Sequence, residues 1–159
     1  MSKRMVTATA ITHHIRDACL CLHVQRAARA VARRYDDVLR PMQLTNGQFS
    51  LLMSLNRAEA PSIGSVAALL AMDRTTLTAN LKPLERRGLV KLAVDAADRR
   101  SRRMTLTPAG RTLLAAAIPL WKRAQAMTED LVSPSRCDRL RADLRALSRE
   151  IPAASSSSR

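Results

Sequence analysis

The most constraining feature of this chain is the order of helix and strand signals over residues 62–110. Two short helices are expected at residues 63–71 and 74–87, and only a tight link separates them. A glycine ends the second helix, a strand begins at residues 89–92, and a second strand returns over residues 102–106. This order predicts a winged helix-turn-helix, in a fold that is mainly α with a small β-hairpin (α+β).

The second of these helices has one side that is expected to be buried. Asp73 can cap its first turn by accepting hydrogen bonds from free backbone amides, as Ser62 can for the preceding helix. Leu77, Leu81 and Leu84 recur at positions i, i+4 and i+7, so they share one face that packs against the rest of the module. The opposite face is therefore available to a partner.

Polar side chains on and beside this open face are candidate contacts to a nucleic acid. Threonine hydroxyl and methyl groups can touch base edges, whereas lysine and arginine contact phosphate and set the register on the duplex. An ordinary solvated face would carry the same residue types, so the helix pair alone leaves both interpretations open. The candidates in this helix are Arg74, Thr75, Thr76, Thr78, Lys82 and Arg86.

The tip of the expected hairpin concentrates positive charge. Arg99 and Arg100 directly follow Asp98 there, and the negative potential of a narrow minor groove attracts an inserted arginine. Asp98 can either hold a neighbouring guanidinium group or simply stabilise the turn, and both roles remain open. An arginine-rich tip beside a helix pair favours a nucleic-acid partner over a merely solubilising surface.

The overall composition agrees with a polyanionic partner. The 159 residues include 27 Lys and Arg against 13 Asp and Glu, a formal net charge of +14. With one Trp, one Tyr and one Phe, the chain has too few aromatic residues for a module that stacks single-stranded bases. An architectural DNA-binding protein of low specificity remains an alternative, because such binding needs little more than charge. An enzyme is not expected, because there is no glycine-rich phosphate loop and no nucleophile–base pair.

The sequence gives no sign of a membrane span, a metal site or another cofactor. No apolar run approaches the ~20 residues that cross a bilayer. Three cysteines, an odd number, argue against a secreted disulfide scaffold, so a cytoplasmic location is expected. Adjacent His13 and His14 would point in different directions on a helix, and together with His23 they lack the carboxylate needed to complete a metal shell.

The segments on either side of the module are expected to form a dimer. Residues 14–44 and 108–150 are assigned to a helical dimerisation region, and residues 45–107 to the DNA-binding domain. An intertwined homodimer would bury the apolar stripes of the outer helices and present two modules to half-sites about one DNA turn apart. We expect helices over residues 14–40, 46–56, 108–131 and 134–149, and flexible termini over residues 1–12 and 152–159.

Five short segments recur in a characteristic order and spacing. They are residues 44–52 (LTNGQFSLL), 72–78 (MDRTTLT), 84–90 (LERRGLV), 98–101 (DRRS) and 106–110 (LTPAG). With these segments the chain resembles the MarR family of bacterial transcriptional regulators, over about residues 14–149. The resemblance implies a homodimer that binds a pseudo-palindromic operator in double-stranded DNA, usually as a repressor released by a ligand or an oxidant. It also implies that Arg100 enters the minor groove and that Asp98 supports it.

The resemblance suggests two ways in which such a protein is switched. Many members bind a small anion, often an aromatic acid, between the dimerisation helices and the module, and Arg16, His23 and Arg26 are candidates to receive its carboxylate. In the peroxide-sensing branch a reactive cysteine occupies the start of the first long helix. Cys21 matches that cysteine, and Tyr35 matches a tyrosine that hydrogen-bonds it across the dimer. Cys21 also lies on the apolar stripe, which instead predicts a small buried core residue. The other candidate redox residues are Cys19 and Cys137.

Overall fold

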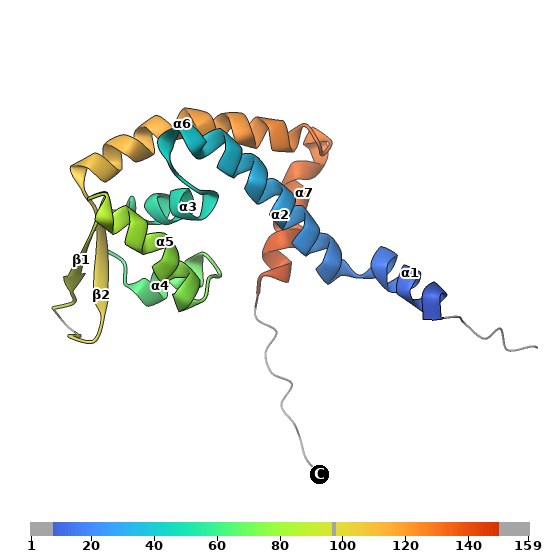
Figure 1. Cartoon of the computed structure of the whole chain (residues 1–159), viewed down its shortest axis with the longest axis horizontal. Helices are drawn as coiled ribbons and strands as arrows, with labels where there is room; N and C mark the ends of the chain where they lie inside the picture. Colours follow the sequence, from blue (N-terminus) through green and yellow to red (C-terminus); the bar gives the residue numbers. More distant parts are fainter. Residues whose placement is uncertain (1–7, 97, 150–159) are drawn as a thin grey trace, which may run out of the picture.

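The computed structural model describes residues 8–96 and 98–149, and these residues are mainly helical with one two-stranded sheet (Figure 1). The expected fold class is therefore confirmed. The elements are α1 (Ala8–Ala18), α2 (Leu20–Leu39), the 3-10 helix η1 (Arg40–Met42), α3 (Asn46–Leu55), α4 (Ile63–Leu69), α5 (Arg74–Arg86), β1 (Val90–Val94), β2 (Arg102–Leu106), α6 (Pro108–Glu129) and α7 (Pro134–Leu147).

The N-terminal part differs from the single helix expected over residues 14–40. Helix α1 starts at Ala8, so residues 8–12, assigned to a flexible terminus, are helical. The remaining residues of both expected flexible ends, 1–7 and 152–159, lie outside the described part of the chain. Cys19 separates α1 from α2 because its backbone is extended, with φ −73° and ψ 104°. No glycine or proline marks this break, so the local sequence gives no warning of it.

Side-chain caps fix where the helices of the module begin. The Thr45 hydroxyl accepts from the Gln48 amide at 3.2 Å, and the Gln48 side chain accepts from the Thr45 amide at 3.1 Å, which completes a capping box for α3. Ser62 and Asp73 cap α4 and α5 as the sequence predicts. Helix α4 ends at Leu69, two residues earlier than expected, and Ala71 turns the chain with a positive φ of 49°.

The two strands pair antiparallel, from Val90 opposite Leu106 to Val94 opposite Arg102. Gly88, with a φ of +67°, adopts the left-handed backbone conformation that ends α5 and leads into the hairpin. Beyond the paired residues the tip is closed by two backbone bonds, from Asp95 N to Ser101 O at 3.0 Å and from Ser101 N to Asp98 O at 2.8 Å. The hairpin is therefore a short ribbon with a charged turn, as the sequence predicts.

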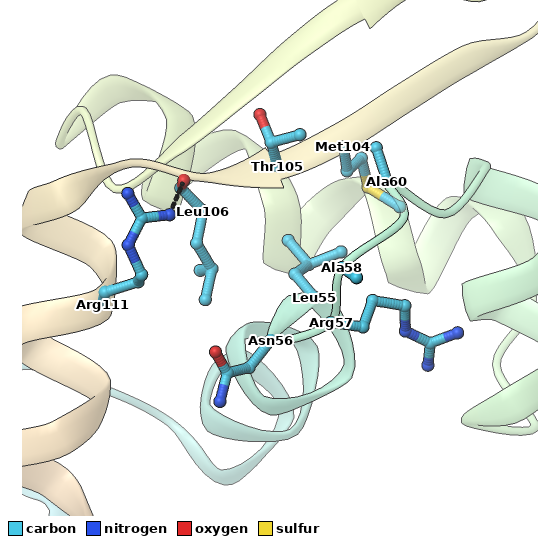
Figure 2. Close-up of a pocket in the computed structure, with 9 residues that line it drawn as sticks. All are labelled: Leu55, Asn56, Arg57, Ala58, Ala60, Met104, Thr105, Leu106 and Arg111. Carbon is cyan, nitrogen blue, oxygen red and sulfur yellow. Dashed lines mark hydrogen bonds between the residues drawn. The ribbon is translucent and has the colours of Figure 1, made fainter.

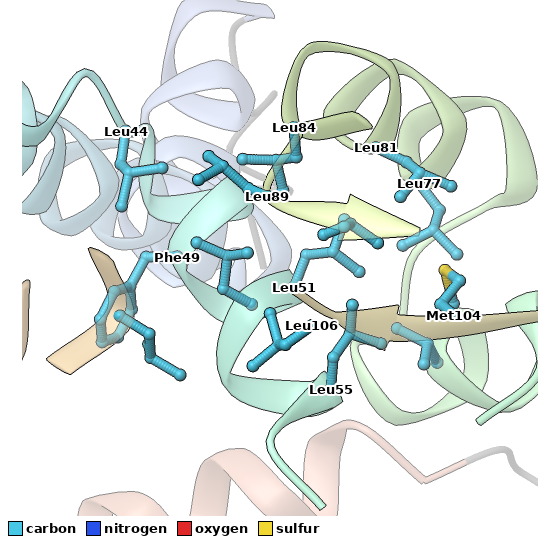
Figure 3. Packing of buried hydrophobic residues seen from close by; sticks show 14 of the residues in the cluster. Leu44, Phe49, Leu51, Leu55, Leu77, Leu81, Leu84, Leu89, Met104 and Leu106 are labelled. Atoms are coloured by element: carbon cyan, nitrogen blue, oxygen red, sulfur yellow. The ribbon is translucent and has the colours of Figure 1, made fainter. Parts of the chain in front are cut away.

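The hydrophobic core joins the module to α6 (Figure 3). Leu77 and Leu84 of α5 are fully inaccessible to solvent and Leu81 is nearly so, which agrees with the predicted buried face. Phe49 of α3 stacks on Trp121 of α6, with ring centroids 6.5 Å apart. Residues 113–121 of α6, assigned from sequence to the dimerisation region, thus also complete the core of the DNA-binding domain.

The outer helices expose apolar side chains. Figure 1 shows α1 projecting away from the core, while α7 turns down from the end of α6. Leu20, the first residue of α2, is 69% exposed in the single chain. The other large exposed apolar side chains of these helices are Ile11, Ile15, Val24, Leu140, Leu144 and Leu147. Their exposure leaves an apolar surface that a single copy of the chain does not cover.

Candidate nucleic-acid interface

An open groove of about 430 Å³ lies between the helix pair and the tip of the hairpin. Helix α4 forms one end, helix α5 forms one side, and the hairpin forms the other. Because these walls come from three elements, only the folded module creates the groove. Its lining residues are Ile63, Gly64, Arg74, Thr78, Asp98, Arg100, Ser101 and Arg102.

The groove continues over the open face of α5. A second, shallower depression of about 370 Å³ shares Arg74 and Thr78 with the first. Its other lining residues are Thr75, Ala79 and Lys82. Four of the six residues predicted in this helix, Arg74, Thr75, Thr78 and Lys82, therefore lie along one surface with the hairpin tip. That surface runs from the middle of α5 to Arg100.

Two threonines of α5 are partly engaged within the helix. Asp73 accepts from the Thr76 amide at 2.8 Å and from the Thr76 hydroxyl at 2.7 Å, and these bonds hold the pKa of the Asp73 carboxyl below its ordinary value. Thr76 lines neither depression, so its position favours capping over base contact. The Thr78 hydroxyl donates to the Arg74 carbonyl at 2.7 Å, and Thr78, unlike Thr76, is one of the residues that line the groove.

Asp98 stabilises the turn at the tip. Its Oδ1 accepts from the Arg100 amide at 2.9 Å, and Arg99 and Arg100 are exposed on either side of this bond. Of the two roles considered for Asp98, this bond is evidence for stabilising the turn. The carboxylate also lies in the groove beside the Arg100 side chain.

The positive charges of this surface have no internal counterpart. Within residues 8–96 and 98–149, the cations of α5, the tip and the start of β2 form no ion pair. This set comprises Arg74, Lys82, Arg86, Arg99, Arg100 and Arg102. Unpaired cations around a groove are the arrangement that binds phosphate oxygens.

Sequence reasoning missed four residues of the groove. Arg102 belongs to the same arginine run as Arg100, and it is exposed as the first residue of β2 although it shares a face of the strand with buried Met104. Ile63, Gly64 and Ser101 carried no comparable signal, because they enter the groove only through the packing of α4 against the hairpin. Arg86 and Arg99, which were predicted, line neither depression but remain exposed at its margins.

The residues predicted to receive an effector carboxylate do not form a pocket in the single chain. Arg16 is exposed on α1 and pairs with the neighbouring Asp17 at 2.6 Å. His23 and Arg26 are exposed on α2, and Nδ1 of His23 lies 2.8 Å from the Cys19 carbonyl oxygen. A cavity of about 480 Å³ lies elsewhere, where the end of α3, the loop after it, β2 and the start of α6 meet (Figure 2).

The three cysteines occupy different environments. Cys21, expected in the core, is exposed in the chain, and the Gln25 amide nitrogen lies 3.2 Å from its sulfur. Cys19 is half-buried at the break between α1 and α2. Cys137 is buried on α7. Tyr35, which the family resemblance pairs with Cys21 across a dimer, donates its hydroxyl to Gln125 of the same chain at 2.5 Å. Of the three cysteines, Cys21 is thus the most accessible in the single chain and Cys137 the least.

The described residues contain neither a cluster suited to a metal ion nor a helix suited to crossing a membrane. No three His, Cys, Asp or Glu side chains come together there in a way that could hold a metal ion. Among the described helices, none combines the length and the apolar character needed to cross a bilayer.

Comparison with known proteins identifies the family. Residues 42–101 match the model of the MarR family. The HTH-type transcriptional regulator TtmR of Methylorubrum extorquens is 38% identical over 97 residues, which cover 61% of this chain but only 50% of that relative. The match thus spans half the length of that curated relative.

Two solved structures match almost over their whole length. The transcriptional regulator MosR of Mycobacterium tuberculosis, solved in complex with DNA, is 39% identical with a TM-score of 0.74, and the match covers 82% of this chain and 93% of that one. BpsR of Bordetella bronchiseptica, solved to explain how 6-hydroxynicotinic acid regulates its DNA binding, is 26% identical with a TM-score of 0.77, over 85% and 96%. These relatives are transcriptional regulators, a class without enzymatic activity, and the chain, with its winged helix-turn-helix fold, belongs to the MarR family of transcriptional regulators.

Proposed function

We propose that the protein regulates transcription by binding a specific DNA operator through the groove between α5 and the hairpin. The observation that carries this proposal is the convergence of Thr78, Arg74 and Arg100 on one groove whose cations have no ion-pair partner in the described chain. Helix α5 would lie in the major groove, where Thr75 and Thr78 reach base edges. The hairpin would place Arg100 in the adjacent minor groove.

The protein acts as a homodimer in this proposal. The exposed apolar side chains of α1, the start of α2 and α7 supply a surface that a second copy can cover. A two-fold axis between copies would present two α5 helices to half-sites about 34 Å apart, the repeat of the DNA helix. The operator is accordingly pseudo-palindromic.

We further propose that the protein is a repressor released by a small aromatic acid. BpsR, whose DNA binding 6-hydroxynicotinic acid regulates, provides a precedent for such a ligand. The 480 Å³ cavity combines an apolar floor, including Leu55 and Leu106, with arginines from two different segments (Figure 2). Arg111 donates to the Leu106 carbonyl at 2.9 Å through one nitrogen, and its other N–H groups remain for a carboxylate.

A fluorescence titration of DNA containing the gene's own upstream region, with a random duplex of equal length as the control, tests the proposal. We expect binding that is tighter to the upstream region at every salt concentration, and weaker once 6-hydroxynicotinic or a related aromatic acid is added. Equal affinity for both duplexes, with a steep dependence on salt, would identify the architectural alternative instead. Selective binding that no aromatic acid weakens would refute the proposed effector class but would leave the proposal of a specific operator intact.

The exposure of Cys21 favours one second candidate, a regulator switched by an organic peroxide. A reactive cysteine must be accessible, and Cys21 is accessible in the chain whereas Cys137 is not. In this alternative, peroxide releases the wild-type protein from the upstream region and a thiol reductant restores binding. Cys21→Ser keeps its DNA affinity and no longer responds to peroxide. A wild-type protein indifferent to peroxide excludes the candidate.

A further inference from the structure

One arginine of the hairpin does not face the groove. Arg103 alternates with Arg102 and Met104 along β2, so its side chain leaves the opposite face of the strand. Its Nε donates to Asp95 Oδ2 at 2.6 Å, and its Nη1 donates to the carbonyl oxygen of Ala60 at 2.9 Å. A single guanidinium group thereby ties together β2, the residue that opens the hairpin tip, and the loop that precedes α4.

The backbone reinforces the same junction. The Met104 amide donates to the Pro61 carbonyl at 3.0 Å, and Ser62 forms an isolated antiparallel bridge with Arg103. Ser62 is also the residue that caps α4. The loop before α4 thus runs alongside β2 like a short third strand. The next residue, Ile63, already lines the groove between α5 and the hairpin.

This anchoring has an energetic reason. A two-stranded ribbon by itself is marginally stable in water, and beyond Val94 and Arg102 the tip has left the paired strands. The Asp95 side chain is only 12% exposed, so the acceptor of its charge-assisted bond from Arg103 is largely shielded from solvent. Removing the guanidinium would take away the cation that faces this largely buried carboxylate, together with one bond that holds the start of the tip in place.

We propose that Arg103 is a positioning residue for DNA binding. It touches no nucleic acid, and it holds the hairpin tip at the distance and angle from α5 at which Arg100 and Thr78 can bind the same duplex. This inference rests on the proposed function and adds a specificity device to it. The spacing between the minor-groove contact and the major-groove contacts is set by the bond from Arg103 to Ala60, in the loop before α4.

A double-mutant cycle between Arg103 and Arg100 tests the inference. In the wild-type protein, Arg100→Ala is expected to weaken operator binding about tenfold or more, the usual effect of losing a specific arginine contact. In an Arg103→Met background the same change is expected to weaken binding by less than about threefold, because the tip is no longer held in place. An equal factor in both backgrounds would overturn the inference, because it would mean that Arg103 affects overall stability or charge alone.

Two variants serve as controls for this cycle. Lys91→Met removes one exposed positive charge from β1 without touching the anchor, and the Arg100 effect should keep its full size there. Arg103→Lys keeps the charge but cannot reach Asp95 and Ala60 with the same fork, so the Arg100 effect should be intermediate. Asp95→Asn is measured in parallel, so that the conclusion does not depend on one variant. Circular dichroism and size-exclusion chromatography check that each variant folds and assembles.

A measurement without DNA separates this inference from the proposed function. The Met104 amide, bonded to the Pro61 carbonyl, should exchange with deuterated solvent faster in Arg103→Met than in wild type or Lys91→Met. Unchanged exchange would overturn the anchor even if DNA binding fell. If the wild-type protein failed to select any duplex while Arg103→Met still accelerated this exchange, the proposed function would fall and the anchor would stand.

Discussion

A β-carbon on Gly110 would lie 2.1 Å from the carbonyl oxygen of Leu89. The first turn of α6 therefore passes directly over the backbone that leads into β1. The same carbonyl accepts the Thr107 amide at 3.1 Å, and the Thr107 hydroxyl donates to the Gly88 carbonyl at 2.7 Å. The module and the long helix α6 are thus joined by a close backbone approach, which a change of side-chain conformation cannot relieve.

Replacing Gly110 with Ala should destabilise the protein severely. The contact is with backbone, which cannot swing away, so we expect a loss of about 3 kcal/mol in the free energy of unfolding. Thermal and urea denaturation measure it. Gly64→Ala is the control, because its nearest new contact would be 3.9 Å away and a helical alanine is favoured over glycine. A Gly110→Ala protein as stable as Gly64→Ala would contradict the close approach.

Thr107→Val tests the polar half of the same junction. The substitution keeps the shape but removes the hydroxyl that donates to the Gly88 carbonyl and accepts from the Gly110 amide at 3.0 Å. The buried Gly110 amide and the part-buried Gly88 carbonyl would each lose this partner, at a cost of about 1–3 kcal/mol. Thr105→Val, two residues earlier on an exposed position of β2, should change stability by no more than about 0.5 kcal/mol. Equal denaturation midpoints for the two variants would argue against the cap.

Thr78 and Lys82 should affect DNA binding in different ways. Thr78→Val removes a hydroxyl at the groove and should change the preferred operator sequence, which a binding-site selection experiment reveals. Lys82→Met removes a phosphate contact and should weaken binding to all duplexes alike, lowering the slope of log affinity against log salt by about 1. If the two variants exchanged these signatures, the proposed orientation of α5 on DNA would be wrong.

Acid should weaken the connection between α6 and α7. The Glu129 carboxylate accepts from Arg141 at 2.7 Å and from Gln125 at 2.6 Å, and the Arg141 bond is the main reason that its pKa lies below the ordinary value. A carboxyl group with a lowered folded-state pKa stabilises the protein above its unfolded pKa, and this stabilisation disappears as the pH falls through the folded value.

The corresponding measurement is the melting temperature from about pH 6 to about pH 3 in wild type and Glu129→Gln. Wild type should lose more of its melting temperature on acidification than the variant, because only wild type has this carboxylate to protonate. Asp143→Asn, on a loosely paired exposed residue of α7, should follow the wild-type curve closely. Parallel curves for wild type and Glu129→Gln would show that the Arg141 bond does not contribute.

Local signals explain why much of the module could be predicted from sequence. Asp73 and Ser62 cap the helices that they were expected to cap, because capping depends on a few neighbouring backbone amides. The spacing of Leu77, Leu81 and Leu84 defines a face whatever the rest of the chain does. The second strand and the arginine-rich tip before it could likewise be predicted from residues that are close together in the chain.

Long-range contacts account for what the sequence did not reveal. Arg103 looks like any other arginine of the hairpin until its partner, a carbonyl 43 residues earlier, is known. Cys21 sits on an apolar stripe, but periodicity defines a face and not what covers it, and in the single chain this residue is exposed. Likewise Arg16, His23 and Arg26 share a helical region without converging on a cavity.

The cations left without internal partners have a consequence for how such a protein finds its target. Each unpaired guanidinium or ammonium group attracts any stretch of DNA, so the protein would spend most of its time sliding along and hopping between unrelated sequences. Occupancy of an operator would then depend on competition with the whole genome, and not on the number of molecules free in solution. A modest gain in selectivity at the operator would change gene expression more than the same gain in overall affinity.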